Sequence, residues 1–245
     1  MLLKGDLMKK ALAYLVVLCF ALLLASCASN APSSGIKYSL TATRQDGATP
    51  TKHELDLAIS ALQERLSAAG YKAYDVEPSD NNSEIIIKLP EEKPVLEPSI
   101  IKNGQLEFAI VQDKYTSIMD EDELNRLKGE GEPVLGPVLL TGDKITSAKA
   151  IYGGQYNSRP AINISFDTEG GTEFAQITGQ SVNKRLAIVL DGKIITAPNI
   201  IGPIPDGKAV IEGIKSIDEA KEIAIVLSHP ISLELSVKDK TTFSR

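Results

Sequence analysis

Apolar residues recur along this chain with the two periods that distinguish strands from helices. In residues 36–44 apolar and polar side chains alternate, which is typical of a strand with one buried face. Thr51 and Glu54 then have capping-box spacing, and apolar side chains follow every three or four residues until Gly70. Glycine at that point suits the left-handed turn that ends a helix. The pattern therefore predicts a strand followed by an amphipathic helix.

Weaker signals complete the first half of the chain. Strands are predicted at residues 71–76, 84–89 and 105–111. A helix is predicted at residues 94–101, although Pro98 within it interrupts helical hydrogen bonding. The resulting order of strand, helix, strand, strand, helix and strand is that of the ferredoxin-like split βαβ fold.

Residues 113–137 are charged and rich in glycine and proline, which is typical of a boundary between subdomains. A run of four acidic residues begins within this segment at Asp120. It lacks the EF-hand spacing and the bidentate glutamate of a calcium loop, so it indicates a solvated helix start. The segment is expected to be a linker.

Both periods return from residue 138 onward. A helix is predicted at residues 168–182, and a second capping box at Ser216 and Glu219 starts another that runs to Leu227. The two halves together predict an α+β chain with two small sheets, each carrying helices on one face. The strands of the second half are predicted at residues 145–152, 161–166, 186–190, 193–197, 208–212 and 231–237.

Residues 186–190 are all apolar, so this strand is expected to be covered on both faces. Asp191 and Gly192 follow, and both residue types tolerate the positive φ angles of a two-residue hairpin turn. Pro198 lacks an N–H and ends the return strand. We interpret the segment as a buried hairpin in which Asp191 and Gly192 are structural turn residues.

The first 26 residues resemble a secretory signal peptide. Two lysines precede an apolar run that is too short to span a membrane comfortably. The run ends in Leu24-Ala25-Ser26-Cys27, which resembles the lipobox of bacterial lipoproteins. In that family the chain is cleaved before the cysteine, here between Ser26 and Cys27, and the cysteine carries the lipid. A plain secreted protein with a free Cys27 is the alternative.

Composition and charge exclude several function classes. The net charge of −6 argues against nucleic acid as a partner, because phosphate binding needs a basic surface. The chain has two histidines, His53 and His229, and no cysteine, histidine or carboxylate cluster accompanies either. Phosphate loops, a nucleophile elbow and a Ser/His/Asp set are also missing. We therefore predict a protein that is not an enzyme, with no catalytic residue, metal, cofactor or small-molecule substrate.

Ordered motifs in the chain resemble the first extracytoplasmic domain of SecD, a membrane protein that works with SecF to assist the Sec protein-export channel. They cover about residues 36–237, with Asn183 where the family often has glycine. The motifs are GQLEF from Gly104, LTG from Leu140, F-x-x-E-G-x-x-x-F-x-x-x-T from Phe166, KRLAIVLDGKIITAP from Lys184, and I-x-G followed by E-A and L from Ile211.

The resemblance implies a ferredoxin-like base subdomain followed by a small α+β head subdomain. The family's membrane helices have no counterpart here, and the lipobox stands where the first of them would be, so a stand-alone lipoprotein is expected. The predicted segments are residues 1–26 as signal peptide, 27–35 as flexible tether, 36–112 as base, 113–137 as linker, 138–231 as head, and 232–245 as a C-terminal strand and tail, with a return of that strand to the base left open.

Two functions follow from the resemblance as expectations. The first is a non-catalytic extracytoplasmic domain, anchored to a bacterial membrane by lipidated Cys27. It would bind unfolded secretory proteins or Sec translocon components and so assist protein transport. The second is a structural or interaction module of an envelope complex that uses the same fold without a role in export.

Overall fold

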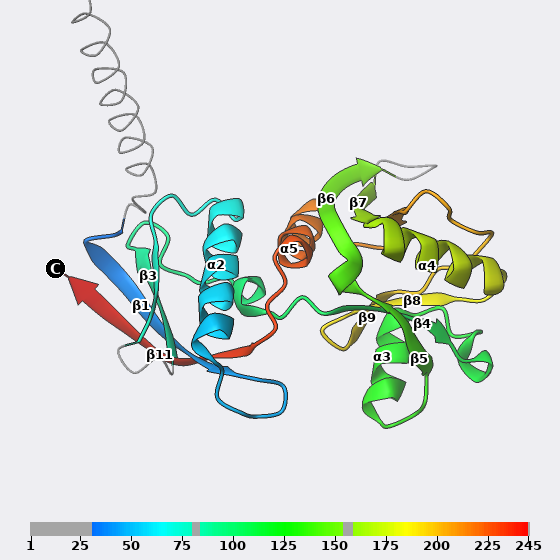
Figure 1. Cartoon of the computed structure of the whole chain (residues 1–245), viewed down its shortest axis with the longest axis horizontal. Coiled ribbons are helices and arrows are strands. Elements are labelled where there is room, and N and C mark those ends of the chain that lie inside the picture. The colour runs from blue at the N-terminus through cyan, green and yellow to red at the C-terminus, as the bar shows by residue number, and fades with distance from the viewer. Residues whose placement is uncertain (1–30, 80–83, 154–158, 245) are drawn as a thin grey trace, which may run out of the picture.

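A computed structural model describes residues 31–79, 84–153 and 159–244 of the chain. These residues form two subdomains that lie side by side and meet at a narrow waist (Figure 1). The base contains the first three strands and the last one, and the head contains the strands between them. The α+β fold class is confirmed. The predicted signal peptide, Ser26 and Cys27 of the lipobox, and the first residues of the tether lie outside the described residues.

The base is an antiparallel sheet of four strands with helix α2 on one face (Figure 1). Its core includes Leu40, Leu62 and Ile87, all fully buried. The strand order β11-β1-β3-β2 is that of a ferredoxin-like sheet, with the head inserted before the fourth strand. The elements of the base are β1 (Ser34–Thr43), α2 (Lys52–Ala68), β2 (Asp75–Pro78), β3 (Glu84–Pro90), the 3₁₀ turn η2 (Pro98–Ile101) and β11 (Glu234–Ser244).

The head contains two antiparallel sheets that share a core. Their strand orders are β5-β4-β8-β9 and β10-β7-β6. The described residues thus form three sheets, where the sequence predicted two, because the strands of the head divide between two layers. The elements of the head are β4 (Leu106–Val111), η3 (Asp113–Tyr115), α3 (Glu121–Gly129), β5 (Leu135–Thr141), η4 (Gly142–Lys144), β6 (Ile145–Gly153), β7 (Arg159–Phe166), α4 (Thr168–Gln180), β8 (Leu186–Leu190), β9 (Lys193–Thr196), β10 (Lys208–Ile211) and α5 (Ile217–Ser228).

The prediction that the strand at residues 105–111 completes the base sheet is wrong. This strand, β4, pairs with β5 and β8 in the head. The place beside β1 belongs to β11, which pairs with β1 from Ser34 opposite Ser244 to Thr43 opposite Glu234. The base therefore ends before β4, and the C-terminal segment supplies its fourth strand. The sequence pattern did not show this, because an apolar run indicates burial but not which sheet the strand joins.

The prediction that residues 113–137 are a linker is also wrong. They form η3, α3 and the start of β5, and they pack on the outer face of the β4-β8 sheet. Tyr115, Leu124 and Val134 are buried there against Ala187 and Val189 of β8. All five residues of β8 are buried, so its outer face needs a cover, and this segment supplies it.

The hairpin turn between β8 and β9 has positive φ at both central residues, 47° at Asp191 and 78° at Gly192. These angles fit the type of two-residue turn that matches the twist of the flanking strands. The Asp191 carboxylate also accepts hydrogen bonds from the backbone N–H groups of Gly104 and Gln105, each at 2.8 Å. The turn therefore touches the segment that enters the head from the base.

Candidate functional site

The described residues contain no group of three or more His, Cys, Asp or Glu side chains that could hold a metal ion. His53 lies exposed in the first turn of α2, and His229 follows α5 at the waist. Within the same described ranges, no helix is long and apolar enough to cross a membrane. The features considered below as a candidate binding surface gather at the waist between the two subdomains.

Two chain segments cross between base and head, residues 102–105 and residues 229–233 (Figure 1). They pair where the backbone N–H of Ile231 donates to the carbonyl of Asn103 at 2.8 Å. In the described residues the buried apolar clusters stay separate, one in the base and two in the head. The apolar cores therefore do not continue from one subdomain into the other, and polar contacts join the two sides at the crossing.

Arg65 is the centre of these contacts. Its position on α2 lies within the stripe of buried residues, and its side chain is fully buried. The guanidinium donates to backbone carbonyls of the base, the crossing segment and the end of α5. The acceptors are Ile100 (2.8 Å), Lys102, Asn103 (3.2 Å), Val226 (3.4 Å) and His229 (2.8 Å).

Burial lowers the pKa of Arg65 to about 10, because the buried guanidinium loses hydration that favours its charged form, and the Asp191 carboxylate opposes this shift. The group therefore stays charged at neutral pH. Among the described residues, no carboxylate oxygen lies within ion-pair distance of Arg65. A buried charge of this kind is tolerated only when its hydrogen bonds are satisfied, and here backbone carbonyls satisfy them.

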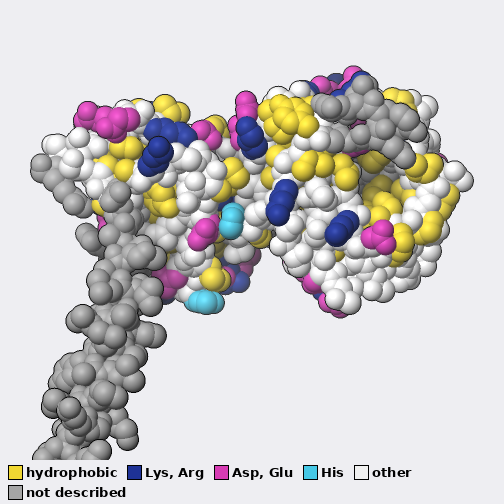
Figure 2. All heavy atoms as spheres, turned by 90° about the horizontal axis from the view of Figure 1, so that it is seen from above, with side chains coloured by type: hydrophobic (Ala, Val, Ile, Leu, Met, Phe, Trp, Pro, Cys, Tyr) yellow, Lys and Arg dark blue, Asp and Glu magenta, His cyan; other side chains and the backbone are white. Residues whose placement is uncertain are grey.

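Three open clefts surround the waist, and Figure 2 shows the narrowing between the two lobes. Their volumes are about 680, 580 and 620 Å³. The first lies between the end of α2 and α5, beside Ala68 and Ile225. The second lies between Leu57 and Leu106, and the third is beside Ile195 under the hairpin. Each cleft joins apolar residues to charged ones and is lined by both subdomains.

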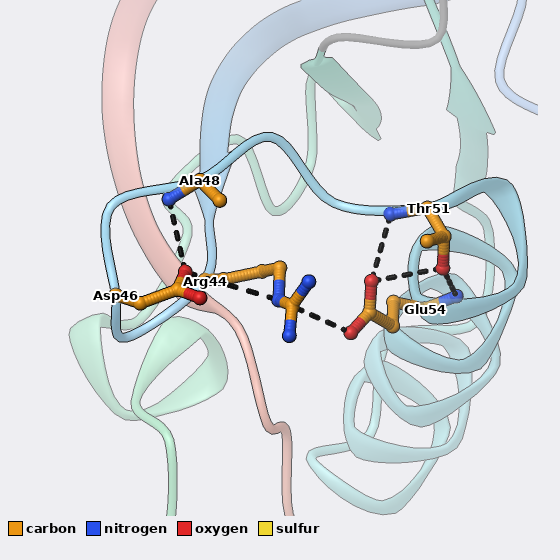
Figure 3. A network of polar contacts seen from close by, with 5 residues as sticks. All are labelled: Arg44, Asp46, Ala48, Thr51 and Glu54. Atoms are coloured by element: carbon orange, nitrogen blue, oxygen red, sulfur yellow. Dashed lines mark hydrogen bonds and ion pairs between the residues drawn. The ribbon is translucent and has the colours of Figure 1, made fainter.

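The loop between β1 and α2 forms one wall near the second cleft and is fixed by a polar network (Figure 3). The N–H of Thr51 donates to the Glu54 carboxylate at 2.7 Å, and the Thr51 hydroxyl accepts from the N–H of Glu54. Arg44 lies 3.5 Å from Glu54, and Asp46 accepts from the N–H of Ala48 at 3.0 Å. The hydrogen bonds from Thr51, backbone first, lower the pKa of Glu54. These contacts hold the loop between β1 and α2 in one conformation beside the second cleft.

The structure places the predicted site residues unequally. Asp191 lines the third cleft at the waist, and Gly192 follows it in the turn, where its carbonyl accepts from Lys128 of α3. Ser26 and Cys27 fall outside the described residues. The sequence analysis missed Arg65. The sequence did contain a sign of this residue's role. Arg65 follows buried Leu62 by three positions, at a place on the helix where the apolar pattern predicts an apolar side chain.

Comparison with known proteins gives one consistent result. A family model described as the SecDF P1 head subdomain matches residues 118–230. The protein translocase subunit SecDF of Thermus thermophilus is 34% identical over 212 residues, which cover 78% of this chain and 28% of that protein. The chain spans 28% of the length of that SecDF and 42% of the length of the protein translocase subunit SecD of Dictyoglomus turgidum, which is 34% identical over 199 residues.

Two solved structures are similar to this chain. One comes from work on a membrane component SecDF that enhances protein export; it has a TM-score of 0.65 and 32% identity, and the match covers 83% of this chain and 98% of that one. The other is SecDF in a super-membrane-facing form, with a TM-score of 0.70, 30% identity, and coverage of 95% of this chain and 35% of that one.

Proposed function

Because this chain belongs to the SecD/SecDF family, we propose that it is an extracytoplasmic domain that assists protein export by binding unfolded secretory polypeptides near the Sec translocon. The observation that carries the proposal is the match to a SecDF structure over both subdomains, at 32% identity and 98% coverage of that structure. The clefts at the waist supply surfaces where a polypeptide could bind without catalysis.

Three of the edge strands in the described residues, β9, β5 and β11, are poorly suited to bind a client by strand addition. Asn125 caps the edge of β9, because its side-chain amide bonds both the N–H and the carbonyl of Ile194 at 2.8 Å. Strand β5 has two register shifts and contains Pro137, and β11 carries Lys238 and Lys240. Prolines, bulges and lysines on an edge strand all disfavour the pairing of another strand with it. We therefore propose that clients bind by burying apolar side chains in the clefts.

The proposed binding can be tested by titrating a permanently unfolded exported protein against the mature chain, with the folded form of the same protein as a control. We expect binding of the unfolded form only, at micromolar or weaker affinity, which is about −8 kcal/mol or less favourable. Such weak binding suits a surface that must accept many sequences. Equal binding to both forms, or to neither, would leave the alternative of an envelope interaction module.

A matched pair of variants locates the site. Leu57 is 55% exposed and lines the second cleft, whereas Val95 is 61% exposed and lies away from the three waist clefts. Leu57→Asp is expected to weaken client binding, because a charge would replace the apolar surface that a client side chain covers. Val95→Asp should leave affinity unchanged. Equal affinities for the two variants would show that the second cleft is not used.

We further propose that Cys27 carries the lipid and that residues 27–35 tether the domain to the membrane. Tethering raises the local concentration of a weak binder at an export site without new contacts. Cys27→Ser is then expected to abolish fatty-acid labelling and to leave a soluble or signal-anchored precursor, in place of a mature lipoprotein that is held by several acyl chains. Labelling cells with a palmitate analogue measures this.

Cys19→Ser is the control for that experiment, since Cys19 lies in the predicted leader. It should label as strongly as the unchanged protein. Persistent labelling of Cys27→Ser would refute the lipobox interpretation and would leave the plain secreted protein.

A further inference from the structure

We propose that Arg65 fastens the head to the base and sets their relative orientation. The inference is independent of the proposed function. It starts from the separation of the apolar cores, since the described residues contain no buried apolar cluster that is shared by the two subdomains. An interface without its own core needs another source of orientation.

The carbonyls bound by Arg65 belong to both subdomains. Ile100 ends η2 of the base, while Val226 lies in the last turn of α5 in the head and His229 follows it. The carbonyls at a helix C-terminus lack the usual partner one turn further along the helix and attract cations. The Val226 carbonyl also accepts the N–H of His229 at 3.3 Å. One side chain that starts on α2 of the base therefore holds the end of a head helix.

The Asp191 carboxylate of the head also binds this crossing segment, by accepting hydrogen bonds from its backbone N–H groups. Arg65 binds the carbonyls of Lys102 and Asn103, and Asp191 binds the N–H groups of the next two residues, Gly104 and Gln105. The segment thus runs from a cation on the base to an anion on the head. Hydrogen bonds to charged groups are stronger than neutral ones, so this short segment is fixed at both ends.

Removing the guanidinium should free the orientation rather than unfold either subdomain. The carbonyls that Arg65 binds lie at a waist bordered by open clefts, so water can reach them if the subdomains separate slightly. Each subdomain keeps its own core. The expected result is a protein in which both subdomains stay folded but the angle between them is no longer fixed.

Arg185 offers a matched control. It is also almost fully buried, and its guanidinium donates to the carbonyls of Ala197 at 2.8 Å and of Ile118. All these residues belong to the head. Loss of Arg185 should therefore lower the stability of the head but leave the orientation of the lobes unchanged.

The test measures the distance between spin labels on Glu64→Cys of α2 and Gln176→Cys of α4, in the full chain with both native cysteines changed to serine. We expect a single narrow distance peak in the parent, loss of that peak in Arg65→Met, and its retention in Arg185→Met. Arg65→Lys, which keeps the charge with fewer donors, should restore part of the peak.

A narrow peak in folded Arg65→Met, or equal broadening in Arg185→Met, would overturn the proposal. If Arg65→Met does not fold, Arg65→Lys and Asp191→Asn decide the question. Both keep the shape of the junction and weaken its charge-assisted bonds, so both must broaden the peak. An unchanged peak in these two variants would overturn the proposal as well.

Discussion

Phe108→Ala is expected to destabilise the head by about 3–5 kcal/mol, the usual cost of removing a buried phenylalanine ring. Phe108 is fully buried at the centre of the head core. Its ring centroid lies 5.8 Å from that of Phe166 and 5.4 Å from that of Phe174. The substitution therefore removes two aromatic contacts and leaves a cavity between the two sheets.

Denaturant unfolding with hydrogen exchange measures both the size and the location of this effect. Amides of β8 should lose protection, because β4 pairs directly with β8, while amides of β1 and β3 should keep it. Tyr152→Ala is the control, since Tyr152 is 64% exposed and its loss should change stability by less than about 0.5 kcal/mol. Loss of protection in β1 and β3 first would mean that β4 stabilises the base after all.

Local signals in the sequence predicted local structure well. The capping box at Thr51 and Glu54 forms with both of its hydrogen bonds, and the predicted helix is observed as α2. The N-cap at Ser216 likewise receives a hydrogen bond from the N–H of Glu219. These signals work because the interacting groups lie within one helical turn, so the sequence contains the whole interaction.

Pairing between distant segments was predicted less well. The motif that contains β4 was interpreted as the end of the base, but this strand pairs with residues about 80 positions later, such as Ile188 opposite Phe108. Residues 113–137 looked like a linker because of their glycines and prolines, yet Tyr115 and Leu124 are buried under β8. Periodicity identifies the buried face of an element and not the element that buries it.

The waist depends even more on distant contacts. The carbonyls that Arg65 binds are 35 to 164 positions away in the sequence, and neither their direction nor their proximity can be inferred from a pattern. An arginine within an apolar stripe was visible, but long side chains often reach solvent from such positions. Only the tertiary structure shows that this one turns inward.

Gly104→Ala is expected to destabilise the protein by about 2–5 kcal/mol, from backbone strain and from overpacking together. Gly104 has a φ of +80°, which side chains with a Cβ rarely adopt. A Cβ there would lie 2.7 Å from Cγ1 of Val226 and 2.8 Å from the Val226 carbonyl oxygen. The second contact is with backbone, so α5 or the crossing segment must move.

Gly70→Ala separates the two causes. Gly70 has nearly the same φ, +81°, but a Cβ there would meet no atom within 4 Å. This control should cost only the strain, about 1–2 kcal/mol, so the difference between the two variants in denaturant unfolding measures the overlap with α5. Because Val226 also binds Arg65, the displacement caused by Gly104→Ala should weaken that bond and expose Arg65 to solvent. Equal losses in the two variants would mean that the crossing segment can shift away from α5 at little cost.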